Sequence, residues 1–413
     1  MFLKFLKKSD PLLWRLITSE IKRQEETIDL IPSENIIPLQ LLEALGSPLA
    51  NKYSEGYPGK RYYPGNKHYD AIENLACERA LKAFKLDPKK WHVNVQPYSG
   101  SPANLEIYSA LMRPGEVLMG MSLFGGGHLT HGHNVNFSGQ IYKSVQYTVK
   151  PATGLIDYQE IGYLAKKHRP KIIVSGLTSY PRKIDFKKIG MIAGKVGAYH
   201  VADISHIAGL VAAGLHQSPF LYSDAVMATT HKTLRGPRGA VIFCKKELAV
   251  RIDRAVFPGM QGGPHNHTIA AIAGMFNEVL KPGFKKYQKQ IIKNSQALSK
   301  TLLESGFDLV SNGTDNHLMV VDLQNAGVDG MTAEKRLEAI GILANRNVVP
   351  GDTSAFKPSG LRLGTPFVTS RGMKEKEMQV IAGLIYSSVF QKEPVAVLSK
   401  KTRLLTQKFP LSY

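Results

Sequence analysis

Two segments, AYHVADIS at residues 198–205 and SDAVMATT at residues 223–230, decide the fold class of this chain. Each is a short, continuously apolar run that ends in polar residues. Three similar runs, EVLMGM at 116–121, KIIVSGL at 171–177 and AVIFC at 240–244, are separated by segments with helical periodicity. Such runs are typical of parallel strands buried on both faces, so we predict an α/β layered domain. Ligands of such sheets bind at the carboxyl ends of the strands.

The α/β pattern begins near residue 70 with AIENLACERALKAF, which predicts a helix. The residues expected on its buried face are Ile72, Leu75, Ala76, Ala80 and Ala83. The pattern ends near residue 250, before the motif GMQGGPHNH at 259–267. A helix-rich stretch broken by LKPGF then leads to a smaller α+β region, so we place a domain boundary near Leu280.

Length and composition exclude several classes of protein. The 413 residues predict two to three domains at ~150 residues each. Apolar residues make up 43% and charged residues 21% of the chain, which argues against a disordered or fibrous protein. No apolar stretch approaches the ~20 residues of a membrane span, and the N-terminus lacks the apolar region of a secretory signal. Cys77 and Cys244 cannot form a disulfide framework or a four-thiolate zinc site, and we predict no metal site.

The chain is strongly basic, with 53 Lys and Arg against 33 Asp and Glu, a net charge of +20. This balance favours anionic partners, which include nucleic acid, acidic membranes and phosphorylated or carboxylated small molecules. Residues 285–300 carry five lysines and no acid. Their helical spacing favours a solvated helix face over a binding surface. Aromatic residues do not alternate with these lysines as they do in nucleic-acid grooves.

The strongest local signal for chemistry is TTHKTLRGPRGA at residues 229–240. A single lysine is usually a solvated surface charge, but Lys232 follows a predicted buried strand. Burial lowers the pKa of an ammonium group and makes the amine a nucleophile. Arg235 and Arg238 nearby suit a phosphate. Asp203, at the end of another strand, is either a strand-end cap or the carboxylate that keeps a pyridine nitrogen protonated, and His206 could orient the ring.

A third element, QPYSGSPAN at residues 96–104, predicts an anion site. We expect Ser101 to be the N-cap and Pro102 the first residue of a helix, whose free amides and the hydroxyls of Ser99 and Ser101 would bind phosphate. The lysine, the aspartate and this helix start together predict a pyridoxal-phosphate site. Arg362 is the candidate for binding the carboxylate of an amino acid, although it could instead support the surface of the small domain.

The chain closely resembles the serine hydroxymethyltransferase (glycine hydroxymethyltransferase) family from about residue 10 to about residue 389. The motifs that carry the resemblance are IDLIPSEN at 28, NKYSEGYPGKRYY at 51, QPYSGSPAN at 96, GGHLTHG at 126, DISHIAGLVAAG at 203, THKTLRGPRG at 230, FPGMQGGP at 257, GTDNHL at 313 and PSGLRLGTP at 358. The resemblance implies a fold-type-I pyridoxal-phosphate enzyme with an N-terminal arm (1–50), a large domain (51–280) and a small C-terminal domain (281–413). It also implies a transferase of one-carbon metabolism that interconverts serine and glycine and passes the hydroxymethyl carbon to tetrahydrofolate, giving 5,10-methylenetetrahydrofolate.

The resemblance assigns roles residue by residue. It supports Lys232 as the cofactor-bound lysine, Asp203 as the partner of the pyridine nitrogen and His128 as the imidazole that stacks on the ring. The phosphate-binding turn is Ser99, Gly100 and Ser101, and the other residues of the cofactor pocket are Thr178, His206, Thr229 and His231. Ser33 and Arg362 match residues that hold the substrate carboxylate. The positions that contact folate in relatives correspond to Leu123, Gly127, Leu129, Asn347 and Phe356.

The family's site is shared between two subunits. The residues that match those donated across the interface are Tyr53, Glu55, Tyr62, Tyr63, Gly262 and Gly263. Read without the family, the tyrosine-rich segment could simply pack at a surface. With it, Glu55 becomes the acid/base closest to the serine hydroxyl, Tyr63 and Thr229 join the catalytic group, and a monomer would be inactive.

The resemblance leaves open questions about activity and assembly. Four positions depart from common family patterns: Pro64, Gly125, Pro181 and Ser205. The chain length favours a homodimer over a tetramer, and about nine residues before the first family helix are too few for an organellar presequence, so we expect a cytoplasmic protein. One alternative activity is a folate-independent aldolase acting on 3-hydroxy amino acids such as allo-threonine. The other alternative is an RNA-binding protein, which only the charge suggests.

Overall fold

The computed structural model describes residues 3–354 and 356–411. Its centre is a seven-stranded sheet in which only one strand runs antiparallel to the rest. In spatial order the strands are β4 (Trp91–Asn94), β10 (Ala240–Lys245), β9 (Ala225–Thr229), β8 (Tyr199–Asp203), β7 (Ile172–Gly176), β5 (Val117–Met121) and β6 (Lys143–Tyr147). The antiparallel strand is β10. The predicted α/β fold with a mostly parallel sheet is therefore confirmed.

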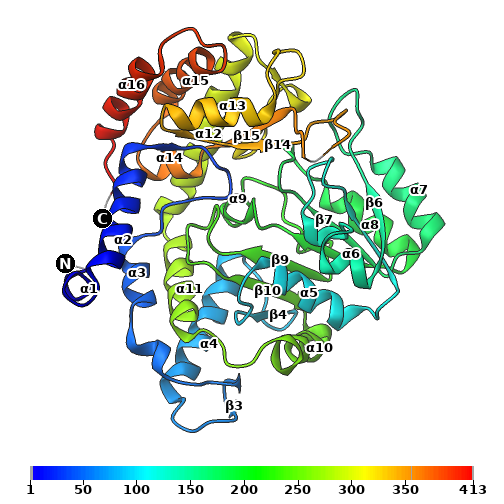
Figure 1. Cartoon of the computed structure of the whole chain (residues 1–413). Helices are drawn as coiled ribbons and strands as arrows, with labels where there is room; N and C mark the ends of the chain where they lie inside the picture. Colours follow the sequence, from blue (N-terminus) through cyan, green and yellow to red (C-terminus); the bar gives the residue numbers. More distant parts are fainter. Residues whose placement is uncertain (1–2, 355, 412–413) are drawn as a thin grey trace.

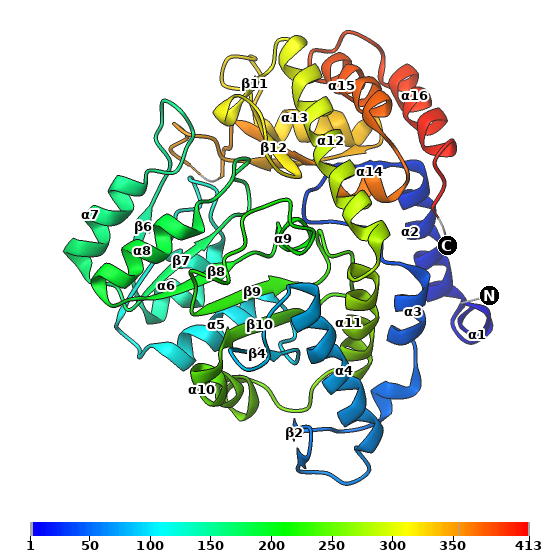
Figure 2. The same ribbon diagram turned by 180° about the vertical axis from the view of Figure 1, so that it is seen from behind.

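Helices cover both faces of this sheet (Figures 1 and 2). Adjacent strand residues point to opposite faces: Ile172 and Val174 pack with α5 (Gly100–Leu111) and α10 (Ala249–Arg254), whereas Ile173 packs with the helices of the other face. Those helices are α4 (Lys67–Ala83), α7 (Tyr158–His168), α8 (Phe186–Val196) and α11 (Asn266–Val279). Burial on both faces explains why the central strands are apolar at every position.

The short elements of this region lie in the connections. They are β2 (Gly56–Tyr57), β3 (Lys60–Arg61), η2 (Leu129–His131), α6 (Phe137–Ile141), α9 (Ala208–Ala212), η3 (Lys246–Leu248) and the kinked π-helical turn η4 (Ala255–Met260). β2 and β3 form a two-stranded antiparallel hairpin. η2 and α9 follow strands β5 and β8, so both border the carboxyl edge of the sheet where ligands of this fold bind.

One predicted helix face differs from the observed one. In α4, Ala76, Ala80 and Ala83 are buried as expected, but the side chain of Leu75 is 38% exposed. Glu73 takes the buried position instead. Its carboxylate lies 2.6 Å from Nη2 of Arg61, which also binds Asp70 at 2.8 Å. Charge pairing with the β3 arginine thus allows an acid on the buried face of the helix.

The C-terminal part builds a second, smaller layer above the carboxyl edge of the central sheet (Figure 1). Its antiparallel sheet contains, in order, β11 (Asp308–Leu309), β12 (Leu318–Asp322), β15 (Gly360–Gly364) and β14 (Asn345–Asn347). Its helices and helical turn are α12 (Pro282–Glu304), η5 (Val310–Asn312), α13 (Gly330–Ala339), α14 (Pro366–Ser370), α15 (Glu375–Val389) and α16 (Val395–Gln407). This arrangement agrees with the predicted α+β character of the region.

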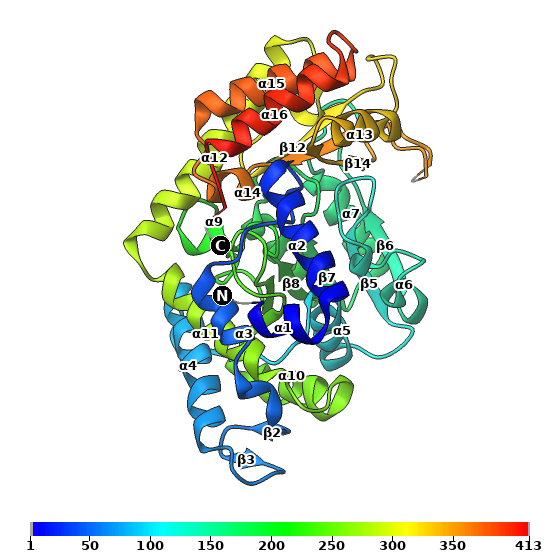
Figure 3. The same ribbon diagram turned by 60° about the vertical axis from the view of Figure 1, so that its left-hand side comes forward.

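The N-terminal segment packs against two hydrophobic cores, a large one around the central sheet and a small one in the C-terminal layer. It contains α1 (Lys4–Ser9), α2 (Pro11–Glu26), β1 (Ile28–Asp29), α3 (Leu39–Leu45) and η1 (Pro48–Asn51). β1 pairs in parallel with β13 (Ile342–Leu343), and α2 lies below α16 (Figure 3). Ile28 belongs to the small core, whereas Leu41 packs in the large one. The division into residues 1–50, 51–280 and 281–413 stays a prediction.

Candidate functional site

A cavity of about 240 Å³ lies at the carboxyl ends of β7, β8 and β9. Its lining combines the turn before α5 with residues that end or follow these strands: Ser99, Gly100, Ser101, Asn104, His128, Leu177, Thr178, Asp203, Ser205, His206, Met227, Thr229, His231, Lys232 and Arg238. Nine of the residues predicted to bind the cofactor are therefore in one place, together with Lys232. The sheet topology brings them together, because parallel strands end at one edge.

Asp203 is the most strongly anchored group in this cavity. Nδ2 of Asn104 donates to its Oδ2 at 3.0 Å, the amide of Ser205 donates to Oδ1 at 3.0 Å, and Nε2 of His131 lies 3.2 Å from Oδ2. Burial alone would raise the pKa of this carboxyl group. The hydrogen bond and the charge of His131, with the Ser205 amide, instead hold it well below its usual value. Asp203 is thus a fixed anion.

Lys232 follows β9 in the same cavity. Burial lowers its pKa from 10.5 to about 8; the positive charges of Arg362 and Arg238 act in the same direction, and Asp203 opposes them. A minor fraction of the amine is therefore uncharged at neutral pH, and this fraction grows as the pH approaches 8. An uncharged amine is the form that attacks an aldehyde carbon.

The turn before α5 presents polar groups to the cavity. Ser99, not Ser101, is the N-cap, so the predicted cap position is wrong by two residues; the helix begins at Gly100, and Ser101 lies in its first turn. The Ser99 hydroxyl makes no capping hydrogen bond. A Cβ on Gly100 would lie 2.6 Å from Cγ2 of Thr229, so only glycine lets α5 approach β9 this closely. The free amides of a helix start bind anions.

Two buried polar atoms beside this turn have no partner among the described residues. They are Oγ1 of Thr229 and Nδ1 of His231. Burial, followed by the charges of Lys232 and Arg238, lowers the pKa of His231 to about 3, so its ring is neutral. Unpaired buried polar atoms are rare in folded proteins and indicate a missing ligand or water. An amine, a fixed carboxylate and an anion-binding turn in one cavity fit pyridoxal 5'-phosphate.

His128 and Thr178 also line the cavity. His128 is the N-cap of η2: its Nδ1 accepts a hydrogen bond from the amide of Thr130 at 3.2 Å. Burial and the neighbouring His131 lower the pKa of His128 to about 4, so the imidazole is uncharged. A neutral ring can stack on an aromatic group without the desolvation cost of a cation.

Arg362, in the middle of β15, reaches toward the cavity from the small sheet. Its Nε donates to Oδ1 of Asn345 at 3.1 Å and its Nη1 donates to the carbonyl of Thr178 at 2.9 Å. Nη2 has no hydrogen-bond partner within residues 3–354 and 356–411. Burial lowers the pKa of Arg362 only to about 10, so the guanidinium stays charged. A fixed guanidinium with a free nitrogen suits a carboxylate.

The model of the serine hydroxymethyltransferase family matches residues 6–385 of the 413. The chain belongs to the serine hydroxymethyltransferase family. The resemblance in the sequence is thus confirmed, and with it the fold-type-I class of pyridoxal-phosphate enzymes. At the level of the family, the reaction is a pyridoxal-phosphate-dependent interconversion of serine and glycine.

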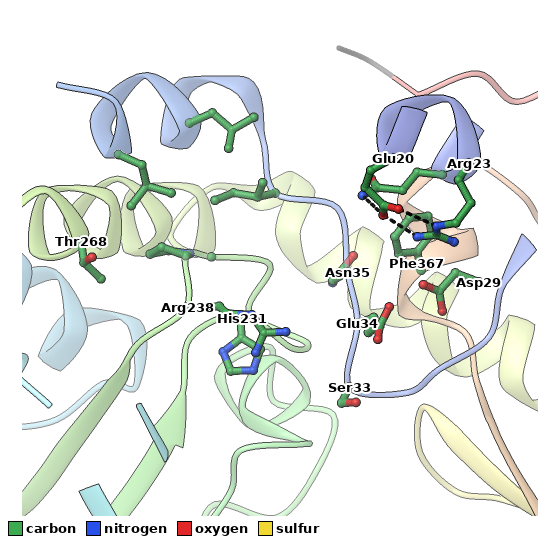
Figure 4. A pocket seen from close by; sticks show the side chains of 16 residues that line it. Glu20, Arg23, Asp29, Ser33, Glu34, Asn35, His231, Arg238, Thr268 and Phe367 are labelled. Atoms are coloured by element: carbon green, nitrogen blue, oxygen red, sulfur yellow. Dashed lines mark hydrogen bonds and ion pairs between the residues drawn. The ribbon is translucent and has the colours of Figure 1, made fainter. Parts of the chain in front are cut away.

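Several other positions that resemble the family's site lie outside the cavity around Lys232. Ser33 lines a neighbouring cavity of about 500 Å³, which shares His231 and Arg238 with the first (Figure 4). Asp29 and Glu34 also line it, on opposite sides of Ser33 along the same segment. Burial, and then the Glu34 carboxyl, raise the pKa of Asp29 well above its usual value. This second cavity therefore has both acidic and basic walls.

The residues predicted to act across a subunit interface are separated from Lys232 in this chain. Tyr53, Glu55, Gly262 and Gly263 line a third cavity of about 450 Å³, whose other walls include Tyr98 and His265. None of these residues borders the cavity around Lys232. Tyr62 and Tyr63 line neither cavity, and 74% and 43% of their surface is exposed. A single chain thus holds two separate groups of predicted site residues.

The predicted folate positions are also dispersed. Leu129 and Phe356 are exposed, Leu123 and Asn347 are half-buried, and none of the five borders the cavity around Lys232. Gly127 has a structural requirement of its own, because a Cβ there would overlap the carbonyl oxygen of Met121. Their role in binding folate stays a prediction.

Sequence reasoning missed the residues that hold the site residues in place: Asn104, His131, His317 and Asn345. Three of them lie in motifs already singled out, namely QPYSGSPAN, GGHLTHG and GTDNHL. The presence of an Asn or His inside such a motif is the signal in the sequence that could have identified these three residues. The described residues include no helix long and apolar enough to cross a bilayer, and no cluster of three or more His, Cys, Asp or Glu that could hold a metal.

Proposed function

We propose that this protein transfers the hydroxymethyl group of L-serine to tetrahydrofolate, forming glycine and 5,10-methylenetetrahydrofolate, with pyridoxal 5'-phosphate bound at Lys232. The observation that carries the proposal is that the Lys232 amine and the Asp203 carboxylate line one cavity beside a free helix start. The family match supports the same class of reaction. The proposal that folate accepts the hydroxymethyl group rests only on the five positions that resemble folate contacts in relatives.

In this proposal the residues of the cavity bind and orient the cofactor. Lys232 would hold its aldehyde carbon through the uncharged amine, with release of water, and Asp203 would keep a proton on its pyridine nitrogen. Ser99, Gly100, Ser101 and the N-terminus of α5 bind its phosphate. When bound, pyridoxal phosphate supplies a protonated ring that withdraws electrons from an attached amino acid and weakens the bonds at its Cα.

Other residues bind the substrate and move its proton. Arg362 binds the substrate carboxylate through its free Nη2, and Ser33, which lines the neighbouring cavity, contributes to the same binding. Glu55 takes up or releases the proton at the serine hydroxyl oxygen, and Tyr63 and Thr229 complete the catalytic group. Because Glu55 and Tyr63 lie apart from Lys232 in one chain, we propose that they act in the site of a second copy, in a homodimer. A cytoplasmic location is proposed from the sequence alone.

The experiment compares the purified protein, loaded with pyridoxal phosphate, in the presence and absence of tetrahydrofolate. We expect glycine formation from labelled serine to depend on folate, and the Lys232→Ala variant to form none. Cleavage of allo-threonine without any folate-dependent serine cleavage would identify the aldolase instead. Borohydride reduction followed by mass spectrometry checks the attachment directly, since the cofactor should remain on the peptide that contains Lys232.

A further inference from the structure

One histidine that lines the cavity around Lys232 contacts a second buried histidine from the other layer of the molecule. His206 follows β8 of the central sheet, and His317 immediately precedes β12 of the small sheet. Nδ1 of His206 lies 3.1 Å from Nε2 of His317, and the two side chains are 3% and 0% exposed. The distance is that of a hydrogen bond, and both side chains are shielded from bulk water.

Each ring of this pair carries a single proton. Burial is the main cause that lowers the pKa of both histidines: that of His317 falls to about 3 and that of His206 falls well below its usual value. The positive charges of Lys232 and Arg362 act in the same direction on both rings. In two neutral imidazoles, one nitrogen of the contact must be a donor and the other an acceptor.

The surroundings of His317 decide which nitrogen donates. Its other nitrogen, Nδ1, is buried and has no hydrogen-bond partner among the described residues. Buried N–H groups without an acceptor are rarer than buried acceptors without a donor. His317 therefore carries its proton on Nε2 and donates to Nδ1 of His206. Nδ1 of His206 then holds a lone pair, so the proton of His206 must be on Nε2.

We propose that His317 is a positioning residue, which fixes His206 in the Nε2–H tautomer so that His206 donates a hydrogen bond into the cavity. His206 lines the cavity with Lys232 and Asp203, and within the described part of the chain its ring makes a hydrogen bond only through Nδ1, to His317. The acceptor is an oxygen of the bound cofactor, so the inference rests on the proposed function. His317 itself does not border the cavity, which distinguishes its role from that of a cofactor-binding residue.

A purely structural role would be to hold the two layers together. A second contact between them provides the control: Nη1 of Arg182 lies 2.9 Å from Oδ1 of Asp315, two residues before His317, and does not touch His206. Arg182→Gln weakens this contact between the layers without affecting the proton on His206. His317→Leu removes the donor, whereas His317→Gln keeps an N–H in its place.

The test measures the dissociation constant of pyridoxal phosphate by fluorescence titration of each full-length variant. We expect His317→Leu to raise it about tenfold, the loss of roughly one hydrogen bond, and His317→Gln and Arg182→Gln to stay within about threefold of the wild type. The inference would be overturned if His317→Leu and His317→Gln raised the dissociation constant equally, or if neither changed it. It would also be overturned if Arg182→Gln raised the dissociation constant as much as His317→Leu. A wild-type protein that binds no pyridoxal phosphate would instead contradict the proposed function.

A second measurement needs no variant that could misfold. Nitrogen-15 NMR of histidine-labelled wild-type protein, with and without pyridoxal phosphate, reports which nitrogen of each ring carries a proton. We expect a proton on Nε2 and a lone pair on Nδ1 for both His206 and His317. A proton on Nδ1 of His206 would overturn the inference whatever the variants show.

Discussion

Glu106, on α5, has a fully buried carboxyl group, and neither of its oxygens has a hydrogen-bond partner among the described residues. Burial alone raises its pKa from 4.5 to about 8. In the unfolded chain this group ionises at about pH 4.5, whereas in the folded protein it stays protonated until about pH 8. The unfolded state therefore releases a proton first, and stability falls as the pH rises through this interval.

Between pH 5 and pH 8, ionisation of this residue should lower the unfolding free energy of the wild type by on the order of 1 kcal/mol per pH unit. We therefore expect the melting temperature of the wild type to fall over this range. Glu106→Gln removes the ionisable group, so its melting temperature should change less over the same range and exceed that of the wild type at pH 8. Glu338→Gln, at an exposed position of α13, is the control and should behave as the wild type. Parallel pH profiles for all three proteins would contradict the explanation.

Asp203 is the residue whose charge, rather than shape, the proposed function requires. Asp203→Asn keeps the side chain's size but removes the negative charge that would hold a proton on the cofactor's ring nitrogen. We expect kcat for glycine formation to fall by at least about 100-fold, as for other fixed electrostatic groups, while pyridoxal phosphate still binds. Asp308→Asn, on the exposed position of β11, is the matched control. A kcat within threefold of the wild type would show that the Asp203 charge is not used.

At the scale of elements, the site depends on how closely α5 approaches β9. A Cβ added to Gly100 would meet Cγ2 of Thr229 at 2.6 Å, so we expect Gly100→Ala to destabilise the protein by about 1–3 kcal/mol and to weaken pyridoxal-phosphate binding. Gly162→Ala, in α7, adds a Cβ in open space and should stabilise by about 0.5–1 kcal/mol. Thermal denaturation and cofactor titration check both. Shifts of the same sign in both variants would contradict the steric argument.

Among the elements, the central strands are the ones that the sequence predicts well. β7, β8 and β9 were predictable because both of their faces are buried, which demands apolar residues at every position. β6 (KSVQY) was not, because it lies at the edge of the sheet and three of its five side chains are exposed. On α4, Glu73 could be assigned to the buried face only with knowledge of Arg61, which reaches it from another element.

The site itself was predictable only in part. Lys232, Asp203 and the turn at Ser99 follow predicted strands, so topology brings them together. Asn104 and His131 escaped prediction because their contact with Asp203 spans 99 and 72 positions of the chain. No local pattern in the sequence shows that an amide or imidazole points at a carboxylate so far away; only the tertiary packing, with α5 against β9 and η2 against β5, reveals it.

At the scale of the whole molecule, one chain carries two halves of the predicted site that do not meet. Lys232 and Asp203 lie in one cavity, Glu55 and Gly263 in another, and Tyr62 and Tyr63 are exposed on the surface. Exposed tyrosines next to a polar cavity are typical of a surface that another protein covers. In two copies related by a twofold axis, the cavity around Lys232 of each chain would meet the group around Glu55 of the other chain.

Mixing two inactive variants tests this arrangement. Lys232→Ala lacks the amine and Glu55→Gln lacks the acid, so each alone should form little glycine. If the site is shared, reassociation gives mixed dimers in which one site contains both mutations and the other contains none. Random pairing makes half of the dimers mixed, so we expect about a quarter of the wild-type activity to return. If Lys232 and Glu55 act within one chain, no chain in the mixture holds both groups, and activity stays at the level of the separate variants. Size-exclusion chromatography of the mixture, after denaturation and refolding together, confirms that dimers have re-formed before the rate is measured.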